Sequence, residues 1–365
     1  MVATAVGERR QQRQTQTDWD RLAARARVRR RARTTAIYAF LIAVSLPVVL
    51  PYFWLVTIAF SAKTGIVETH ILWRSILVLA PALLALWVWS TLARNMRQMV
   101  LGFAAVAVAT IVVFAVLVGP DLHLGNFIFL VEPDFVDVIR SRTGTVAGSI
   151  SFPNVWHAFG NSLFLAGGQT VIVATVASLA GYYLSRFQFP GRVAMLRSLL
   201  VLHAFPVLTL IVPLFLILNF VGLLDQLIGV ILVLVGLELP FAIFIMKGFF
   251  DAVPWDIEMS ALADGASRRQ AFVKVVLPQV SNGLIAISVF SFIRGWEEYI
   301  FVFTFLIKNT NWTMSLYMFF VRDDVMGTDF GVVSAVGVFY LVPSLVMYAA
   351  AQKYLMQMSV GGVKG

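Results

Sequence analysis

Three charged residues stand inside a hydrophobic segment that is long enough to cross a membrane. Arg294, Glu297 and Glu298 lie near the middle of "LIAISVFSFIRGWEEYIFVFTFLI", residues 284–307. On insertion scales a charged side chain costs about 3 kcal/mol at the centre of a membrane helix. Charges inside a membrane face the protein interior or a water-filled cavity, so this segment is the first candidate for a functional site.

Two interpretations of these charges stay open. On a helix Arg294 lies three and four residues before Glu297 and Glu298, so it can neutralise one of them and brace the bundle as an ion pair. Alternatively, the charges line a hydrated path together with the adjacent rings of Trp296 and Tyr299. The second interpretation predicts that the charges mark the face of this helix that turns away from lipid.

An earlier apolar segment also carries polar side chains. Asn161 and Ser162 stand at its start, and Gln169 with Thr170 follow two turns later. These groups either face the same path or form hydrogen bonds between helices.

The composition requires a membrane protein. The chain has 365 residues, of which 59% are hydrophobic and 13% are charged, and its mean hydropathy is +0.85. Soluble domains have about 25% charged residues. Several apolar runs exceed the roughly 20 residues that span a bilayer as a helix, and runs such as "IGVILVLVGL" lack the alternation of a membrane β-strand. We therefore expect an all-α polytopic fold.

Hydropathy predicts eight transmembrane helices. They cover residues 36–60, 72–92, 98–119, 160–184, 194–219, 225–247, 283–307 and 331–353. Residues 1–34 carry ten Arg against three acidic residues, and basic residues also concentrate in every second loop. By the positive-inside rule both termini are cytoplasmic, which explains the basic tail without a nucleic-acid partner.

The sequence offers no catalytic or metal-binding pattern. It has no Cys, no GxxxxGK[ST] phosphate loop and no HExxH motif, and its four His are scattered. We therefore expect a protein that is not an enzyme, with no catalytic residue, no metal site and no cofactor bound by this chain.

The loop "PWDIEMSALADGASRRQAFVKVVLPQV", residues 254–280, predicts two short helices joined at a corner. Asp256 and Glu258 suit the first turn of a helix, and Gly265 can adopt the left-handed conformation that ends it. Ser267 and Gln270 then form a capping box for the second helix. A short amphipathic helix of this kind can dock in a groove of a partner protein.

This loop resembles the EAA loop of permease subunits from ATP-binding-cassette (ABC) importers. The family's Glu position holds Met259, and Glu258, one residue earlier, is expected to replace it as the ATPase contact. Ala261 alone of the EAA triplet is intact. The residues that match the remaining pattern at its spacing are Asp264, Gly265, Ala266, Phe272, Leu277 and Pro278.

The resemblance extends over residues 150–365 and about 36–63. The segments "YYLSRFQFPGR", "FGNSL", "IVPLFLILNFVGLLDQ" and "LPFAIFIMKGFFDAVP" resemble core helices of carbohydrate permeases, and "GWEEYIF" resembles their Trp-Asn-Glu-Phe segment. The ending "GGVKG" is similar to that of the maltose permease subunit with the short periplasmic region.

The resemblance implies a six-helix core with an added transmembrane hairpin. The expected organisation is a basic cytoplasmic tail at 1–34, a first transmembrane helix at 35–63, the extra hairpin at 64–119 and a periplasmic segment at 120–159. The permease core at 160–355 contains the coupling loop 254–280, and a cytoplasmic tail covers 356–365.

The resemblance also implies the partners and the cargo. A second, different permease subunit is expected to complete the translocation path as a heterodimer, and two ATPase subunits are expected to bind ATP and Mg. A periplasmic or lipid-anchored binding protein delivers a sugar, most simply an oligosaccharide. The resemblance places the protein in the cytoplasmic membrane of a bacterium or archaeon.

Two other classes remain to be weighed. A proton-coupled secondary transporter would explain the intramembrane charges, together with Glu238, without any ATPase. A membrane-embedded glycosyl or lipid transferase would need a polar catalytic cluster in its loops, and none stands out.

Overall fold

A computed structural model describes residues 33–38, 40–41, 43–61, 70–92, 95–132, 152–324 and 329–361. Within these ranges the regular structure is helical, apart from one isolated bridge between Ser61 and Leu122. The basic tail and most of the "GGVKG" ending lie outside the described residues. The chain divides into two units, residues 1–57 and 58–365.

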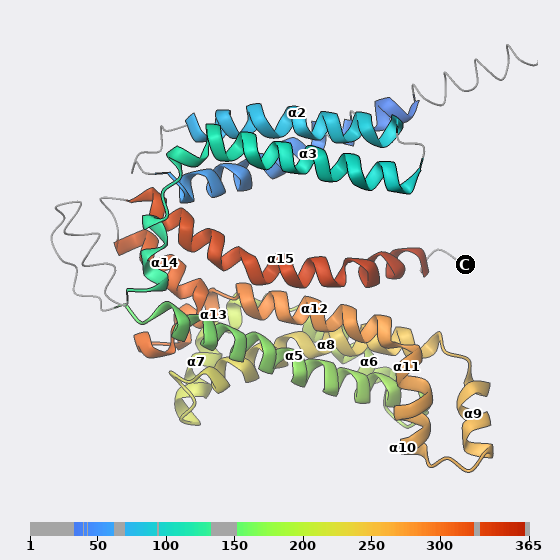
Figure 1. Cartoon of the computed structure of the whole chain (residues 1–365). Coiled ribbons are helices and arrows are strands. Elements are labelled where there is room, and N and C mark those ends of the chain that lie inside the picture. The colour runs from blue at the N-terminus through green and yellow to red at the C-terminus, as the bar shows by residue number, and fades with distance from the viewer. Residues whose placement is uncertain are drawn as a thin grey trace, which may run out of the picture. The chain divides into compact units, whose positions relative to one another are not determined.

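The first unit contains most of an apolar helix that spans Arg33–Ala59 and is long enough to cross a membrane. The second unit begins with two further helices, α2 (His70–Leu92) and α3 (Met96–Leu117), which pack against each other as a hairpin (Figure 1). Their bounds agree with the predicted spans at 72–92 and 98–119. Two short 3-10 helices, η1 (Gly119–Asp121) and η2 (Gly125–Leu130), follow the hairpin.

The core of the second unit is a bundle of four long helices. They are α5 (Val155–Arg186), α8 (Leu227–Asp251), α12 (Ser281–Glu297) and α15 (Phe330–Gly361), and they lie side by side in Figure 1. Glycines allow close approach. A Cβ on Gly181 of α5 would lie 2.9 Å from Lys247 N of α8, and a Cβ on Gly295 of α12 would lie 2.9 Å from Ala166 Cα of α5. Small residues are the usual solution for helix contacts in membranes.

The predicted span at 194–219 is not one helix. The helix α6 (Arg192–His203) ends before Pro206, the 3-10 helix η3 (Val207–Leu210) follows, and α7 (Ile211–Phe220) completes the segment. The two halves meet at 90°. Pro206 causes the bend, because it lacks an N–H and disfavours the helical conformation of the residue before it. The hydropathy pattern predicts one span here because it does not depend on the direction of the chain.

The predicted span at 283–307 is also interrupted. After α12 ends at Glu297, Glu298 is extended with φ −64° and ψ 120°, and α13 (Ile300–Phe305) begins after Tyr299. Neither Pro nor Gly stands at this break, so the sequence carries no local backbone signal for it. Side chains stabilise the break instead: Phe301 N donates to Glu298 Oε1 at 3.0 Å, and Ser315 Oγ donates to the Glu298 carbonyl at 2.7 Å.

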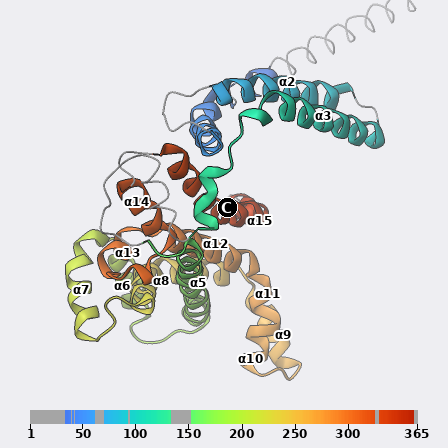
Figure 2. The ribbon, with the colours of Figure 1, turned by 60° about the vertical axis from the view of Figure 1, so that its left-hand side comes forward.

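The two ends of the bundle differ. At one end, Figures 1 and 2 show α9 (Trp255–Ala263), α10 (Arg268–Ala271) and α11 (Leu277–Gln279) extending from α8 and α12, with a π-helical turn η4 (Phe272–Val276) between the last two. At the other end lie the 3-10 helix η5 (Asn309–Asn311) and α14 (Met314–Asp324). Hydropathy predicted no helix at α14. Six described helices are long and apolar enough to cross a membrane, or up to eight if each bent pair is one span.

Candidate functional site

The corner between α9 and α10 has the backbone geometry that the loop sequence predicts. Gly265 has φ +89°. Its N–H donates to the Leu262 carbonyl at 3.1 Å, and Ala266 N donates to the Ala261 carbonyl at 3.0 Å. This pair of bonds is the Schellman arrangement that ends a helix. The Ser267–Gln270 capping box is present in both directions and starts α10, so two helix ends fix the angle of the corner.

Glu258 lies inside the protein rather than on a face open to a partner. Its side chain is fully buried and accepts hydrogen bonds from Tyr182 Oη at 2.5 Å and Arg186 Nε at 3.1 Å. Arg186 also donates to the Val253 carbonyl at 2.9 Å, and its guanidinium lies 5.4 Å from the centre of the Trp255 ring. The Glu258 carboxylate thus anchors α9 to the end of α5, and its replacement of the EAA glutamate as the ATPase contact stays a prediction.

The same anchor reaches the second helix of the loop. The Tyr182 ring lies 4.6 Å from the Phe272 ring and 5.7 Å from the Phe250 ring. Tyr182 thus contacts both helices of the corner. The other residues of the loop pattern divide by exposure: Asp264 and Gly265 are exposed, Pro278 is exposed in α11, and the half-buried members are Met259, Ala261, Ala266, Phe272 and Leu277.

A buried polar cluster joins three helices in the middle of the bundle. Glu238 of α8, 6% exposed, accepts hydrogen bonds on Oε2 from Gln169 of α5 at 2.5 Å and from Ser291 of α12 at 3.0 Å. Gln169 Oε1 is buried without a hydrogen-bond partner. Glu238 Oε1 has no partner within the described part of the chain. Buried polar atoms are normally paired, so the buried Gln169 oxygen is an exception in this cluster.

The cluster borders a cavity of about 160 Å³. One wall comes from the bend between α6 and η3, including His203 and Phe205, and the opposite wall includes Gln169, Glu238 and the residues at the end of α12. Both helix interruptions therefore meet at one cavity. Inside a membrane, irregular backbone is tolerated where it is buried in protein or lines a hydrated cavity, and broken helices form the binding sites of many transporters.

Arg294 and Glu298 both line this cavity, but they do not form the expected ion pair. Across the described ranges Arg294 has no carboxylate within salt-bridge distance. Once the helix ends at Glu297, the helical spacing that would bring Glu298 over Arg294 no longer applies. The prediction of an internal ion pair is therefore wrong, and the N–H donors of the Arg294 guanidinium are not bound to a carboxylate of any described residue.

The neighbouring residues of this segment have other surroundings. Trp296 is 1% exposed, donates from Nε1 to the Tyr340 carbonyl at 3.1 Å, and stacks on Phe292 and Tyr340. The structure places it in the contact between α12 and α15, not on the cavity. Tyr299 packs between Phe303 and Phe319. Glu297 is exposed and outside the cavity lining.

Asn161 and Ser162 hold a loop at the α14 end of the bundle. Asn161 Nδ2 donates to the Thr310 and Trp312 carbonyls, each at 2.9 Å, and Ser162 Oγ accepts from Met314 N at 2.7 Å. The structure thus favours the hydrogen-bonding interpretation of these two residues over a direct contact with cargo. Thr170 bonds to its own helix at the Ala166 carbonyl.

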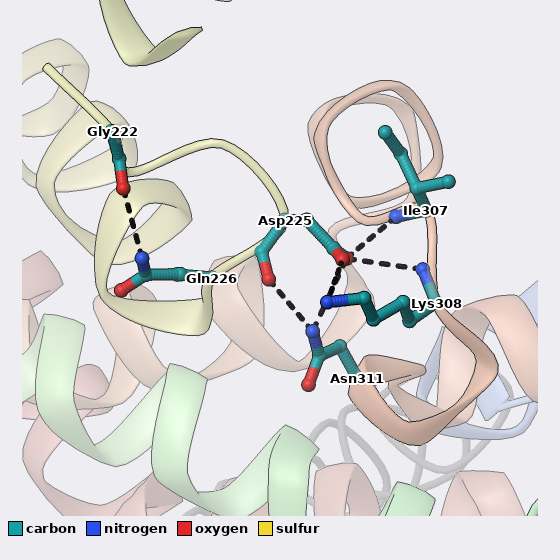
Figure 3. Close-up of polar contacts among 6 residues, drawn as sticks. All are labelled: Gly222, Asp225, Gln226, Ile307, Lys308 and Asn311. Carbon is teal, nitrogen blue, oxygen red and sulfur yellow. Dashed lines mark hydrogen bonds and ion pairs between the residues drawn. The ribbon is translucent and has the colours of Figure 1, made fainter.

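Asp225 holds the same loop from the other side (Figure 3). It has φ 60° in the turn between α7 and α8. Its Oδ1 accepts from Ile307 N at 2.9 Å, from Lys308 N at 3.0 Å and from Asn311 Nδ2 at 3.1 Å. We call Asp225 with Ile307, Lys308 and Asn311 the outer lock.

Asp225 lies outside the membrane-spanning helices, and its pKa is lowered. Burial alone would raise the pKa of this carboxyl, but the bonds from Lys308 N, Ile307 N and Asn311 and the nearby Lys308 ammonium together outweigh burial. The Lys308 ammonium is 3.5 Å from Asp225 Oδ2. The charged form of Asp225 is therefore the form that the outer lock stabilises.

Comparison with known proteins identifies the family. Residues 173–355 match the family model described as binding-protein-dependent transport system inner membrane component, so the match includes α8, the loop 254–280 and α12. The chain belongs to this family.

Curated relatives agree with the binding-protein-dependent permease family. An inner membrane ABC transporter permease protein of Escherichia coli, YcjP, is 32% identical over 59% of this chain and 76% of its own length. A diacetylchitobiose uptake system permease protein of Streptomyces coelicolor, NgcG, is 32% identical over 55% of this chain and 67% of its own. A trehalose transport system permease protein of Mycobacterium tuberculosis, SugB, is 30% identical over 56% of this chain and 76% of its own.

A solved structure shares the permease fold. A chain of a bacterial ABC transporter involved in the import of the acidic polysaccharide alginate superposes with a TM-score of 0.57 at 18% identity, over 87% of this chain and 95% of that one. The permease is thus a multi-pass inner membrane protein, as its apolar helices require.

The sequence marks some of the functional residues of the permease and gives no sign of others. Glu238 is a lone acid in the apolar run "IGVILVLVGLELPFAIF", where the sequence links it only to the proton-coupled alternative. Asp225 in "GLLDQ" marks a turn between two apolar helices. Tyr182 and Arg186 carried no signal, because a partner on α9 cannot be read from the sequence.

Proposed function

We propose that this chain forms half of the translocation path of a sugar importer and couples it to separate ATPase subunits through the loop 254–280. Relatives named as diacetylchitobiose and trehalose permeases support a sugar, and an oligosaccharide fits best. A second permease subunit completes the path, an external binding protein delivers the sugar, and the ATPase subunits hold ATP and Mg.

One observation carries this proposal: the rigid corner at the α9–α11 end of the bundle. The corner has exposed Asp264 and Gly265 at its tip, and its two helices are anchored to α5 by Tyr182 and Glu258. An ATPase that grips the tip differently in its open and closed states would move α9 and the end of α5 together. Differential contact of this kind is what coupling requires.

The buried Glu238 favours a second candidate, a proton-coupled transporter, because intramembrane carboxylates form proton relays in such proteins. The two candidates differ in their energy source.

Reconstitution separates the two candidates. The chain is co-expressed with its companion permease and ATPase subunits, and uptake of radiolabelled trehalose, diacetylchitobiose and a galactooligosaccharide into proteoliposomes is measured. We expect uptake only with enclosed ATP and external binding protein. Uptake by this chain alone under a proton gradient, without ATP, would establish the second candidate and reject the first.

A further inference from the structure

We propose that the cavity at the two helix breaks is a subsite for one uncharged sugar ring, and that it disfavours sugars that carry a carboxylate. This inference rests on the proposed function, because it names the part of the cargo that the path would contact. The carboxylates of Glu238 and Glu298 accept from sugar hydroxyls, and the Arg294 guanidinium donates to them.

The first argument is the size of the cavity. Its volume is about 160 Å³, and an apolar protein cavity of about 150 Å³ binds a benzene ring. The space therefore suits one six-membered ring rather than a whole oligosaccharide, which would pass with one ring at a time in the cavity. Phe205 and Phe301 contribute aromatic walls, and ligand sites combine such walls with a few placed polar groups.

The second argument is the supply of free hydrogen-bonding groups. Glu238 Oε1 accepts no hydrogen bond from any described residue, and Arg294 makes no ion pair within the described ranges. Sugar hydroxyls both donate and accept, so they can satisfy this acceptor and the guanidinium at once. The lining is held in place by the bonds of Glu238 to Gln169 and Ser291, which join α5, α8 and α12.

The third argument is charge. The lining contains two acidic side chains, Glu238 and Glu298, and one arginine, Arg294, so acidic side chains outnumber arginine in it. A cleft lined by one sign of charge with apolar walls concentrates ions of the opposite sign and repels its own. A metal ion is not the expected occupant, because no group of three or more His, Asp or Glu among the described residues is placed to hold one.

Because the chain contains no Cys, a single introduced thiol can report on this cavity. Leu237 lines the cavity beside Glu238 without being one of the proposed binding groups. In the assembled complex we would compare labelling of Leu237→Cys on this chain by two methanethiosulfonates of similar size, one with a trimethylammonium and one with a sulfonate. Thr310→Cys, in the exposed loop at the α14 end, is the matched control for intrinsic reactivity.

We expect the ammonium reagent to react with Leu237→Cys faster than the sulfonate by about tenfold after normalisation to Thr310→Cys. Adding Glu298→Gln or Glu238→Gln should reduce this preference, and two variants keep the test valid if one fails to fold. Trehalose, diacetylchitobiose or galactotriose should slow the labelling, and digalacturonate should slow it less.

Equal normalised rates, a preference for the sulfonate, or no reaction at Leu237→Cys would overturn the proposal. Protection by none of the neutral sugars, or equal protection by digalacturonate, would do the same. Protection by sodium ions instead of sugars would indicate a cation site. Labelling requires neither ATP nor uptake, so it can succeed or fail independently of the transport experiment.

Discussion

At the scale of single residues, Arg186 and Glu258 form a buried ion pair between the end of α5 and α9. The side chain of Arg186 is 6% exposed and that of Glu258 is 0% exposed. Removing one partner of a buried pair leaves an uncompensated charge, which costs about 3–5 kcal/mol. The pair therefore sets the position of α9 relative to α5, with Tyr182 as a third member.

We predict that Glu258→Gln lowers the melting temperature of the purified complex. It should also weaken the stimulation of ATP hydrolysis by the binding protein. The amide can still accept from Tyr182, but it leaves Arg186 without a counter-charge. Asp256→Asn is the matched control, since Asp256 lies on the same helix and its side chain is exposed; it should change stability by less than about 0.5 kcal/mol. Equal effects of the two variants would show that the pair has no special role.

The outer lock should respond to acid. Because the pKa of Asp225 is lowered in the folded protein, its contribution to stability is present above the ordinary Asp pKa of about 3.9 and is lost as pH falls through the lower folded value. At neutral pH Asp225→Asn should therefore reduce the melting temperature. Below about pH 4 the difference from the unmodified chain should shrink.

Lys308→Gln is the control for the outer lock. The Lys308 side chain is 75% exposed, and exposed ion pairs contribute about 0–1 kcal/mol, while the bond from its backbone N–H survives the substitution. A melting difference for Asp225→Asn that stays constant from pH 7 to pH 3 would contradict the account of the lock.

At the scale of elements, the break between α12 and α13 depends on side chains rather than on Pro or Gly. We predict that Ser315→Ala destabilises the break by about 1–3 kcal/mol, because it removes the hydroxyl that donates to the Glu298 carbonyl. Ser288→Ala is the matched control, since Ser288 donates to Leu284 within its own helix. Chemical unfolding of the complex measures both, and equal losses would argue against the role of Ser315.

The elements also show how far a sequence can be read. The corner at Gly265 and the capping box at Ser267 could be predicted because helix ends have local backbone rules. The bend at Pro206 had a visible cause, but hydropathy integrates over a window and hides direction. The break at Glu298 could not be predicted, because its stabilising donor, Ser315, lies on a different element.

The same reasoning applies to the site residues. Arg294 and Glu298 were recognised as unusual from their place in an apolar run, and the structure does bring them to one cavity. Asn161, Ser162 and Trp296 were chosen by residue type, and each has a packing or hydrogen-bond partner far along the chain. Residue type indicates what a side chain can do, but only long-range contacts decide what it does.

At the scale of the whole molecule, the chain is a permease whose two ends differ in structure. The α9–α11 end carries the rigid corner at Gly265, and the α14 end holds its loop from two sides through Asn161 and Asp225. The cavity lies among the core helices that connect them. The domain boundaries, including the extra hairpin at 64–119, and the cytoplasmic placement of both termini stay predictions.

The most direct test of the coupling proposal uses Gly265. With φ +89° this residue occupies a conformation that other residues rarely adopt, and a charged side chain would also alter the tip of the corner. Gly248→Ala is the control, because a Cβ at this position in α8 meets no atom within 4 Å and the residue has no positive φ.

Both variants should be measured in proteoliposomes, per mole of assembled complex, for ATP hydrolysis stimulated by the binding protein and for sugar uptake. For Gly265→Asp we predict that both activities are lost while the permease still co-purifies with its ATPase subunits, and for Gly248→Ala that both are retained. Normal hydrolysis together with normal uptake in Gly265→Asp would contradict the account.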